Sequence, residues 1–148
     1  QDRLYLNQDN QFALATDALP ASTDSSGPVT SADIDQDGDL DLFIGGRLIP
    51  GAYPTAPASR LLKNDGGKFT LAAQFELGMA TDALFADIDG DQDPDLLITT
   101  EYGPIHCLTN QTPPKSPDSP NSKAGGTVLT QQTSMEMAIS ISPSPTLV

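Results

Sequence analysis

Two short stretches of this sequence gather enough carboxylates to bind a metal ion. Residues 33–41 read "DIDQDGDLD" and residues 87–95 read "DIDGDQDPD", and each runs directly into an apolar segment. Two carboxylates about 4 Å apart repel each other by about 1 kcal/mol in water and by about 4 kcal/mol at an effective dielectric constant of 20. A bound divalent cation turns that repulsion into attraction. The crowding of aspartates therefore predicts a cation site in each stretch.

The spacing of the aspartates favours calcium as the cation. In the pattern D-x-D-x-D-G-x-x-D, alternate carboxylates of a tight loop turn inward and the seventh residue offers its backbone carbonyl. Ca²⁺ accepts about six to eight such oxygens at about 2.3–2.6 Å, and a glycine at the sixth position allows the sharp turn. In the first loop Gly38 stands at that turn, and the expected ligands are the side chains of Asp33, Asp35, Asp37 and Asp41 and the carbonyl of Asp39.

The second loop departs from the first at two positions. Gln92 stands where the first loop has Gly38, and Pro94 follows Asp93. A residue other than glycine at positive φ is strained by about 1–3 kcal/mol. We therefore expect the second loop to bind its ion more weakly than the first.

Three other interpretations of these loops are weaker. An EF-hand places a glutamate at position twelve, where this chain has Ile44 and Ile98, and here strands rather than helices flank the loops. A Gly-Gly calcium roll needs many nonapeptide repeats, which are absent. A solvated acidic turn explains one copy, but two copies at matched repeat positions favour a metal.

Composition excludes some classes of partner. Twenty acidic residues face seven basic ones among 148 residues, for a net charge of −13, and half of the acidic residues lie in the two loops. Such a surface is unsuited to nucleic acid or to an anionic membrane. No apolar run reaches the length of a membrane span, so we expect no membrane insertion. Cys107 is the single cysteine, which excludes a disulfide within the chain.

A repeat of short strands surrounds the loops. Residues 3–12, "RLYLNQDNQF", align without gaps with residues 60–69, "RLLKNDGGKF", and the second loop begins 54 residues after the first. Four short strands in each repeat predict a β-propeller blade, and a β-sandwich with acidic turns is less consistent with the matched offsets. We expect one complete blade over residues 28–72, the end of another over 1–15 and the beginning of a third over 82–110. Because about three or more repeats are needed to bury such a core, we expect a fragment of a longer protein.

Three segments carry a resemblance to a known family: "ADIDQDGDLDLFIGGR", "SRLLKNDGGKFT" and "TDALFADIDGDQDPDLLI". Over residues 1–110 the chain resembles the FG-GAP/VCBS-type calcium-binding propeller repeats of integrin α-chain heads and secreted bacterial proteins. The resemblance implies an all-β, seven-bladed propeller with Ca²⁺ between the first two strands of a blade. It also implies an extracellular, periplasmic or cell-surface location. The metal positions that it implies are Asp33, Asp35, Asp37, Asp39, Asp41, Asp87, Asp89, Asp91, Asp93 and Asp95.

The expected function is a calcium-stabilised scaffold, or an adhesion module that binds a protein or glycan ligand. The alternative is a part of a propeller enzyme such as a polysaccharide lyase. We expect no catalytic residue in this chain, because no nucleophile is paired with a base. The adjacent His106 and Cys107 point to opposite faces of a strand, so they do not converge on one ion.

Residues 111–148 are rich in proline, serine and threonine, which predicts a disordered tail. The alternative is a third blade translated in a shifted frame. When each codon is taken from the third base of the printed frame, Met135-Glu136 forces a glycine, since Met codons end in G and Glu codons begin with GA. In that frame residues 132–148 can spell "DVDGDGDLDIAVSNFG", a third Asp loop followed by an apolar strand. Sequencing the encoding DNA distinguishes the two interpretations.

Overall fold

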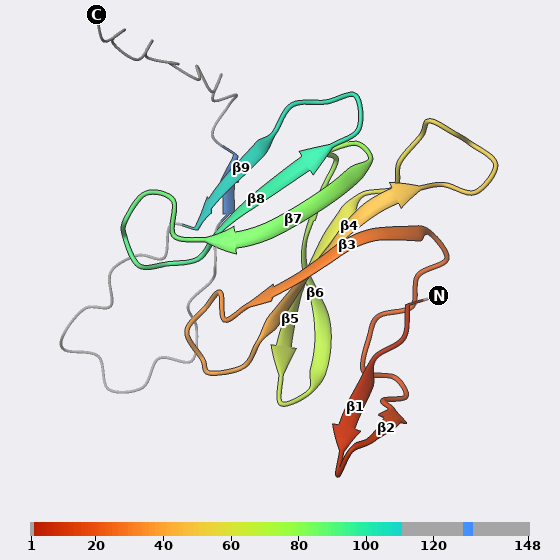
Figure 1. Ribbon diagram of the computed structural model, residues 1–148, viewed down its shortest axis with the longest axis vertical. Helices are drawn as coiled ribbons and strands as arrows, with labels where there is room; N and C mark the ends of the chain where they lie inside the picture. The colour runs from red at the N-terminus through yellow and green to blue at the C-terminus, as the bar shows by residue number, and fades with distance from the viewer. Residues whose placement is uncertain (1, 111–128, 132–148) are drawn as a thin grey trace, which may run out of the picture.

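The computed structural model describes residues 2–110 and the backbone of residues 129–131. These residues form ten β-strands in three antiparallel sheets and no helix (Figure 1), so the all-β prediction is confirmed. Accordingly, no helix of the described residues is long and apolar enough to cross a membrane. The predicted tail, with its shifted-frame alternative, lies outside the described residues except for 129–131.

The first four-stranded sheet follows the chain in the order β3-β4-β5-β6. Its strands are β3 (Ser25–Ala32), β4 (Asp41–Leu48), β5 (Ser59–Asp65) and β6 (Lys68–Phe75). A two-residue turn joins β5 to β6, and both of its residues, Gly66 and Gly67, have positive φ. Tight hairpins require this backbone geometry, and glycine adopts it without steric cost. This sheet covers residues 28–72, where the sequence predicts a complete blade, and extends a few residues beyond them at both ends.

The second four-stranded sheet has the same sequential order. Its strands are β7 (Ala80–Ala86), β8 (Asp95–Thr100), β9 (His106–Asn110) and β10 (Leu129–Gln131). The sequence predicts only the beginning of a unit over residues 82–110. The structure adds β10, which pairs antiparallel with β9 through the pair Leu129 and Asn110. The second sheet therefore repeats the arrangement of the first.

The third sheet is the hairpin of β1 (Tyr5–Gln8) and β2 (Gln11–Leu14). Its turn residues, Asp9 and Asn10, both have positive φ, which these two residue types tolerate better than most. The hairpin therefore reproduces the two-residue turn between β5 and β6. The alignment of residues 3–12 with residues 60–69 thus corresponds to a real structural equivalence.

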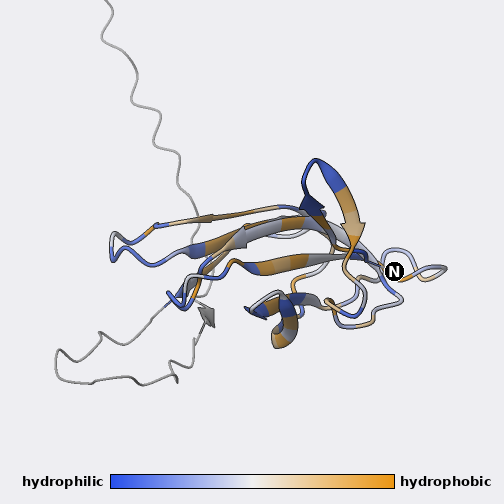
Figure 2. Cartoon of the chain, turned by 90° about the horizontal axis from the view of Figure 1, so that it is seen from below, coloured by the Kyte–Doolittle hydropathy of each residue, from blue (hydrophilic) through white to orange (hydrophobic). Residues whose placement is uncertain are grey.

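The first sheet packs on both faces, against the second sheet on one face and against residues of the N-terminal segment on the other. Because neighbouring strand residues point in opposite directions, Phe43 of β4 faces the second sheet and Ile44 faces the N-terminal segment. The larger core forms between the two four-stranded sheets, and Figure 2 shows the hydrophobic residues along the stacked strands. Its buried members are Ile34, Phe43, Leu61, Leu77, Ala80, Leu96, Ile98 and Leu108. A smaller core joins Ile44, Leu62 and Phe69 to Leu4, Leu19 and Leu42.

The two four-stranded sheets approach each other closely at Gly45. A Cβ atom on Gly45 would lie 2.7 Å from the Cβ of Ala80 and 2.8 Å from the Cδ of Pro28. No ordinary side chain fits there, so the glycine allows β4 to contact β7. This contact brings the end of the first sheet where β4 finishes next to the end of the second sheet where β7 begins.

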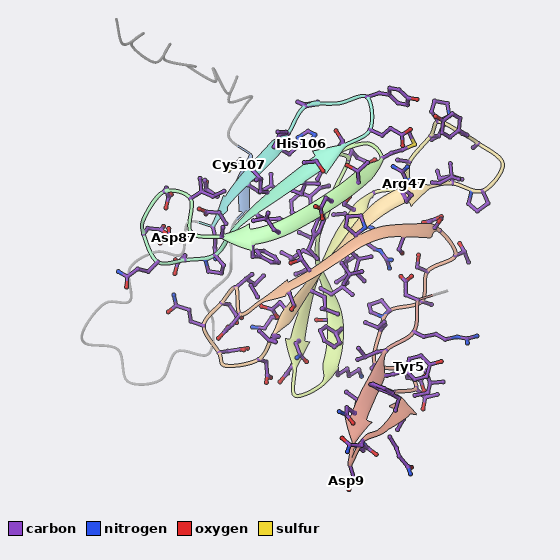
Figure 3. All side chains as sticks on the ribbon, in the orientation of Figure 1. Tyr5, Asp9, Arg47, Asp87, His106 and Cys107 are labelled. Carbon is purple, nitrogen blue, oxygen red and sulfur yellow. The ribbon has the colours of Figure 1, made fainter. Side chains whose placement is uncertain are left out.

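Polar contacts join the two sheets at the end where β4 and β8 finish. Arg47 and Glu101 form an ion pair of 2.5 Å, and the hydroxyls of Tyr53 and Tyr102 lie 3.4 Å apart. Figure 3 shows Arg47 at this end of the strands and Asp87 at the other. The aspartate-rich loops therefore occupy the end opposite to these contacts.

Candidate metal centres

The two aspartate-rich segments occupy equivalent places in the two four-stranded sheets. The first Asp loop, residues 33–41, leads from β3 into β4, and the second Asp loop, residues 87–95, leads from β7 into β8. Each loop ends one strand and begins its antiparallel neighbour, so its chain must reverse within a few residues. The aspartate side chains make most of the hydrogen bonds that hold this reversal.

The first aspartate of each loop closes the turn. The two carboxylate oxygens of Asp33 accept hydrogen bonds from the backbone N–H groups of Asp37 and Gly38, at 3.1 and 3.0 Å. Asp87 accepts bonds from the N–H groups of Gly90, at 2.7 Å, and Gln92, at 3.1 Å, and Gln92 is the counterpart of Gly38. A short carboxylate that bonds the backbone a few residues ahead stabilises such a turn without any ion.

The last aspartate of each loop is fully buried and ties the loop to the third strand of its sheet. Asp41 accepts hydrogen bonds from the backbone N–H groups of Ile34, at 3.1 Å, and Asn64, at 2.8 Å. Asp95 makes the equivalent pair, one bond within its loop and one from Asn110 at 2.8 Å. Burial raises the pKa of the Asp41 carboxyl, and the two backbone bonds oppose that rise. These two aspartates therefore act as buried structural bridges.

Each loop gathers three carboxylates into a cluster whose oxygens lie within 4.8 Å of one another. The first cluster consists of Asp33, Asp35 and Asp37. The second cluster consists of Asp87, Asp89 and Asp95. The structure thus brings together six of the ten aspartates expected from the sequence, three in each loop.

The other four aspartate side chains lie outside the two clusters and bind neighbouring groups. Asp41 accepts its hydrogen bonds from Ile34 and Asn64, and Asp39 accepts one from the backbone N–H of Gly66 at 2.9 Å. Asp91 accepts one from the N–H of Asp93 at 2.9 Å, and Asp93 accepts one from the amide of Gln36 at 2.5 Å. The contact between Gln36 and Asp93 links the first Asp loop directly to the second.

The chemistry of the first cluster fits a hard cation. Only 9% of the Asp35 side chain is exposed, and its Oδ1 has no hydrogen-bond partner in the described residues. A buried carboxylate oxygen without a donor is costly, and a cation supplies the missing partner. Carboxylate oxygens are the donors that Ca²⁺ and Mg²⁺ prefer, whereas zinc sites use mainly histidine and cysteine.

A lysine distinguishes the first cluster from the second. The ammonium of Lys63 on β5 bonds the Asp35 carboxylate and lies 3.5 Å from Oδ2 of Asp37. The hydrogen bond to Asp35 is the main reason that the pKa of Lys63 is raised. The backbone N–H of Asp39 and, after it, Lys63 lower the pKa of Asp37. The first cluster therefore has a cation supplied by the chain itself.

The corresponding position beside the second cluster is neutral. Lys63 precedes Asn64, whose N–H bonds the buried Asp41, and Thr109 precedes Asn110, whose N–H bonds the buried Asp95. The Thr109 hydroxyl is buried and has no hydrogen-bond partner in residues 2–110.

In the second cluster the pKa of Asp89 is raised, and within the described residues no lysine forms an ion pair with it that would lower it. Desolvation raises the pKa of Asp89, opposed by the N–H of Asp91, while the charges of Asp91 and Asp95 add to the rise. The aspartate pattern alone does not point to Lys63, but the repeat offers a signal, since the residue before this asparagine is Leu6 in "RLYLN", Lys63 in "RLLKN" and Thr109 in "HCLTN".

Backbone strain is distributed differently from the expectation. Gln92 has a φ of 74°, which confirms the positive φ predicted for it. Gln36 in the first loop also has a positive φ, of 58°, and the glycines Gly38 and Gly90 occupy the remaining positions of this kind. Each loop therefore has one glycine and one glutamine at positive φ, in opposite order. Both loops contain a glutamine strained by positive φ. The prediction that backbone strain weakens calcium binding only in the second loop is therefore wrong.

His106 and Cys107 do not join either cluster. No group of three metal-ligating side chains within the described residues includes them. Burial raises the pKa of the Cys107 thiol, and the charges of Asp95 and Asp89 raise it further. A half-buried thiol with a raised pKa is a poor nucleophile and a poor metal ligand.

Comparison with known proteins supports the family resemblance for the first part of the chain. Residues 1–44 match the family described as the FG-GAP-like repeat, a range that includes the β1–β2 hairpin, β3 and the first Asp loop. No curated protein and no solved structure matches the chain. The chain therefore contains a repeat of the FG-GAP type.

Proposed function

We propose that this chain is part of a calcium-stabilised β-propeller in an exported protein, where it serves as a scaffold or as a ligand-binding module. Its FG-GAP-like repeat and its two equivalent, stacked four-stranded sheets support the propeller. A propeller blade is a four-stranded antiparallel sheet that buries its faces against neighbouring blades. The first sheet, which is packed on both faces, fits that role.

One observation carries the calcium part of the proposal. Two equivalent loops each gather three carboxylates within 4.8 Å, and a buried oxygen of Asp35 in the first cluster has no donor. Mg²⁺ keeps several waters and usually takes one or two carboxylates, whereas Ca²⁺ accepts more carboxylate and carbonyl ligands in flexible geometry. Asp33, Asp35 and Asp37 would hold the ion in the first loop, and Asp87, Asp89 and Asp95 in the second.

The proposed location is outside the cell or in the periplasm, and the proposed partner is a protein or a glycan. FG-GAP repeats occur in extracellular proteins, and extracellular calcium modules need an affinity of only about 10⁻⁴–10⁻³ M. The proposed role is non-catalytic.

Thermal melting of the full chain tests the calcium part directly. At a concentration one hundred times the Kd, Ca²⁺ should stabilise the chain by about 2.7 kcal/mol for each occupied site, compared with EDTA. The double variant Asp35→Asn/Asp89→Asn keeps the side-chain sizes and removes one charge from each cluster, so its calcium response should be lost or greatly reduced. Identical melting curves of the unsubstituted chain in Ca²⁺ and in EDTA would reject the proposal.

A further inference from the structure

We infer that Lys63 is the built-in counter-ion of the first Asp loop, so that calcium binds the second loop first and enters the first only by displacing the ammonium. This inference rests on the proposed function, because it concerns the order in which the same ion fills the two loops. It reverses the order expected from the strain at Gln92.

The contacts of Lys63 put a cation where a metal ion would bind. Its ammonium bonds Asp35 and lies 3.5 Å from Oδ2 of Asp37, so it touches two of the three carboxylates of the first cluster. The Asp35 side chain is only 9% exposed, so its carboxylate is largely shielded from solvent, while 42% of the Lys63 side chain stays exposed. Two cations within a few ångströms repel each other, so a divalent ion and the ammonium compete for the same carboxylates.

The second loop has the same framework without the internal cation. The residue that corresponds to Lys63 is Thr109, because each precedes the asparagine whose N–H bonds the buried last aspartate of its loop. No ion pair of the described residues involves Asp87, Asp89 or Asp95. The buried Thr109 hydroxyl also has no hydrogen-bond partner in the part of the chain that the structure describes, so this position carries a neutral hydroxyl where the first sheet carries a positive charge. The second cluster therefore attracts a divalent ion more strongly.

The experiment is a calorimetric titration of the full 148-residue chain with Ca²⁺. The unsubstituted chain should bind one ion tightly and a second at least about tenfold more weakly, which corresponds to about 1.4 kcal/mol. Lys63→Thr, which installs the residue type of the second sheet, should tighten the weak site about tenfold. Lys63→Met should act in the same direction while it keeps an apolar stem.

Two further sets of variants provide the controls. Lys68→Thr removes one positive charge from an exposed residue of β6 and should leave both affinities unchanged. Asp89→Asn should abolish the tight phase of the unsubstituted chain, and Asp35→Asn should abolish the weak one. These variants assign each phase to one loop.

The outcomes separate the inference from the proposed function. If Lys63→Thr leaves the weak site unchanged, or if Asp35→Asn removes the tight phase, the inference is wrong although calcium binds. Two equal sites in the unsubstituted chain would also contradict it. If neither the unsubstituted chain nor Lys63→Thr binds Ca²⁺, the proposed function fails and the inference fails with it.

Discussion

The first and second Asp loops share one sequence pattern and one framework, yet they differ in electrostatics. In both loops the first aspartate closes the turn, and the buried last aspartate, Asp41 or Asp95, bonds the backbone of the third strand. Lys63 contacts the first cluster, whereas Thr109 occupies the corresponding position beside the second. The loop sequence thus determines the backbone framework, while a strand outside the loop determines the charge that an incoming ion meets.

The largest effect should come from the feature that the loops share. In EDTA, Asp41→Ala and Asp95→Ala should each lower the free energy of unfolding by about 2–4 kcal/mol, because each leaves one buried and one part-buried backbone N–H group without an acceptor. Urea unfolding measures both variants, and Asp41→Asn, which retains one acceptor oxygen, should cost less than Asp41→Ala. A cost below about 0.5 kcal/mol for either alanine variant would show that the buried bridge contributes little.

A smaller effect should separate the two loops. In EDTA at low ionic strength, Lys63→Thr should destabilise the chain by about 1 kcal/mol, because it leaves the carboxylates of the first cluster without their counter-ion. The loss of unfolding free energy should be this small because 42% of the Lys63 side chain is exposed and water screens its charge. High salt screens exposed charges, so the cost should shrink when NaCl is added. A cost that does not change with salt would mean that the lysine acts through packing of its stem.

The smallest effect concerns the glutamines at positive φ. Gln92→Gly should stabilise the chain by about 0.5 kcal/mol in EDTA, since relief of strain exceeds the added flexibility of the unfolded chain. Gln36→Gly should stabilise the chain by a smaller amount, because it also removes the hydrogen bond from the Gln36 amide to Asp93. Chemical unfolding of both variants ranks them. If Gln36→Gly is the more stabilising of the two, the bond between the loops has no energetic value.

Local sequence signals predicted most of the fold. The sequence predicts repeats of four short strands because glycine, proline, asparagine and aspartate separate the apolar runs, and these residue types mark nearly every boundary from β1 to β9. The aspartate pattern also located both clusters, since the spacing of two residues brings carboxylates together within one turn. The fourth strand of the second sheet was missed because β10 lies beyond a long stretch of serine and proline, where no alternating pattern signals it.

The features that distinguish the loops depend on contacts between distant residues. Lys63 reaches Asp35 only because β5 pairs with β4 in one register, and the sequence does not state that register. The bond between Gln36 and Asp93 depends on how the two sheets stack. The positive φ of Gln36 is not predicted, because glycine is the residue that usually marks this conformation in a sequence and none stands at position 36.

The two aspartate loops match each other in length, whereas the connections that follow β4 and β8 at the opposite end do not. At the end with the aspartates, the connections over residues 33–40 and 87–94 are both eight residues long. At the opposite end, the connection over residues 49–58 has ten residues and the one over 101–105 has five. An insertion or deletion in an aspartate loop would break the hydrogen bonds that close it, whereas the other end already accommodates a twofold difference in length. The bonds that close the aspartate loops therefore fix their length, whereas the connections after β4 and β8 can accept an insertion, and with it a new recognition surface, without disturbing the aspartates.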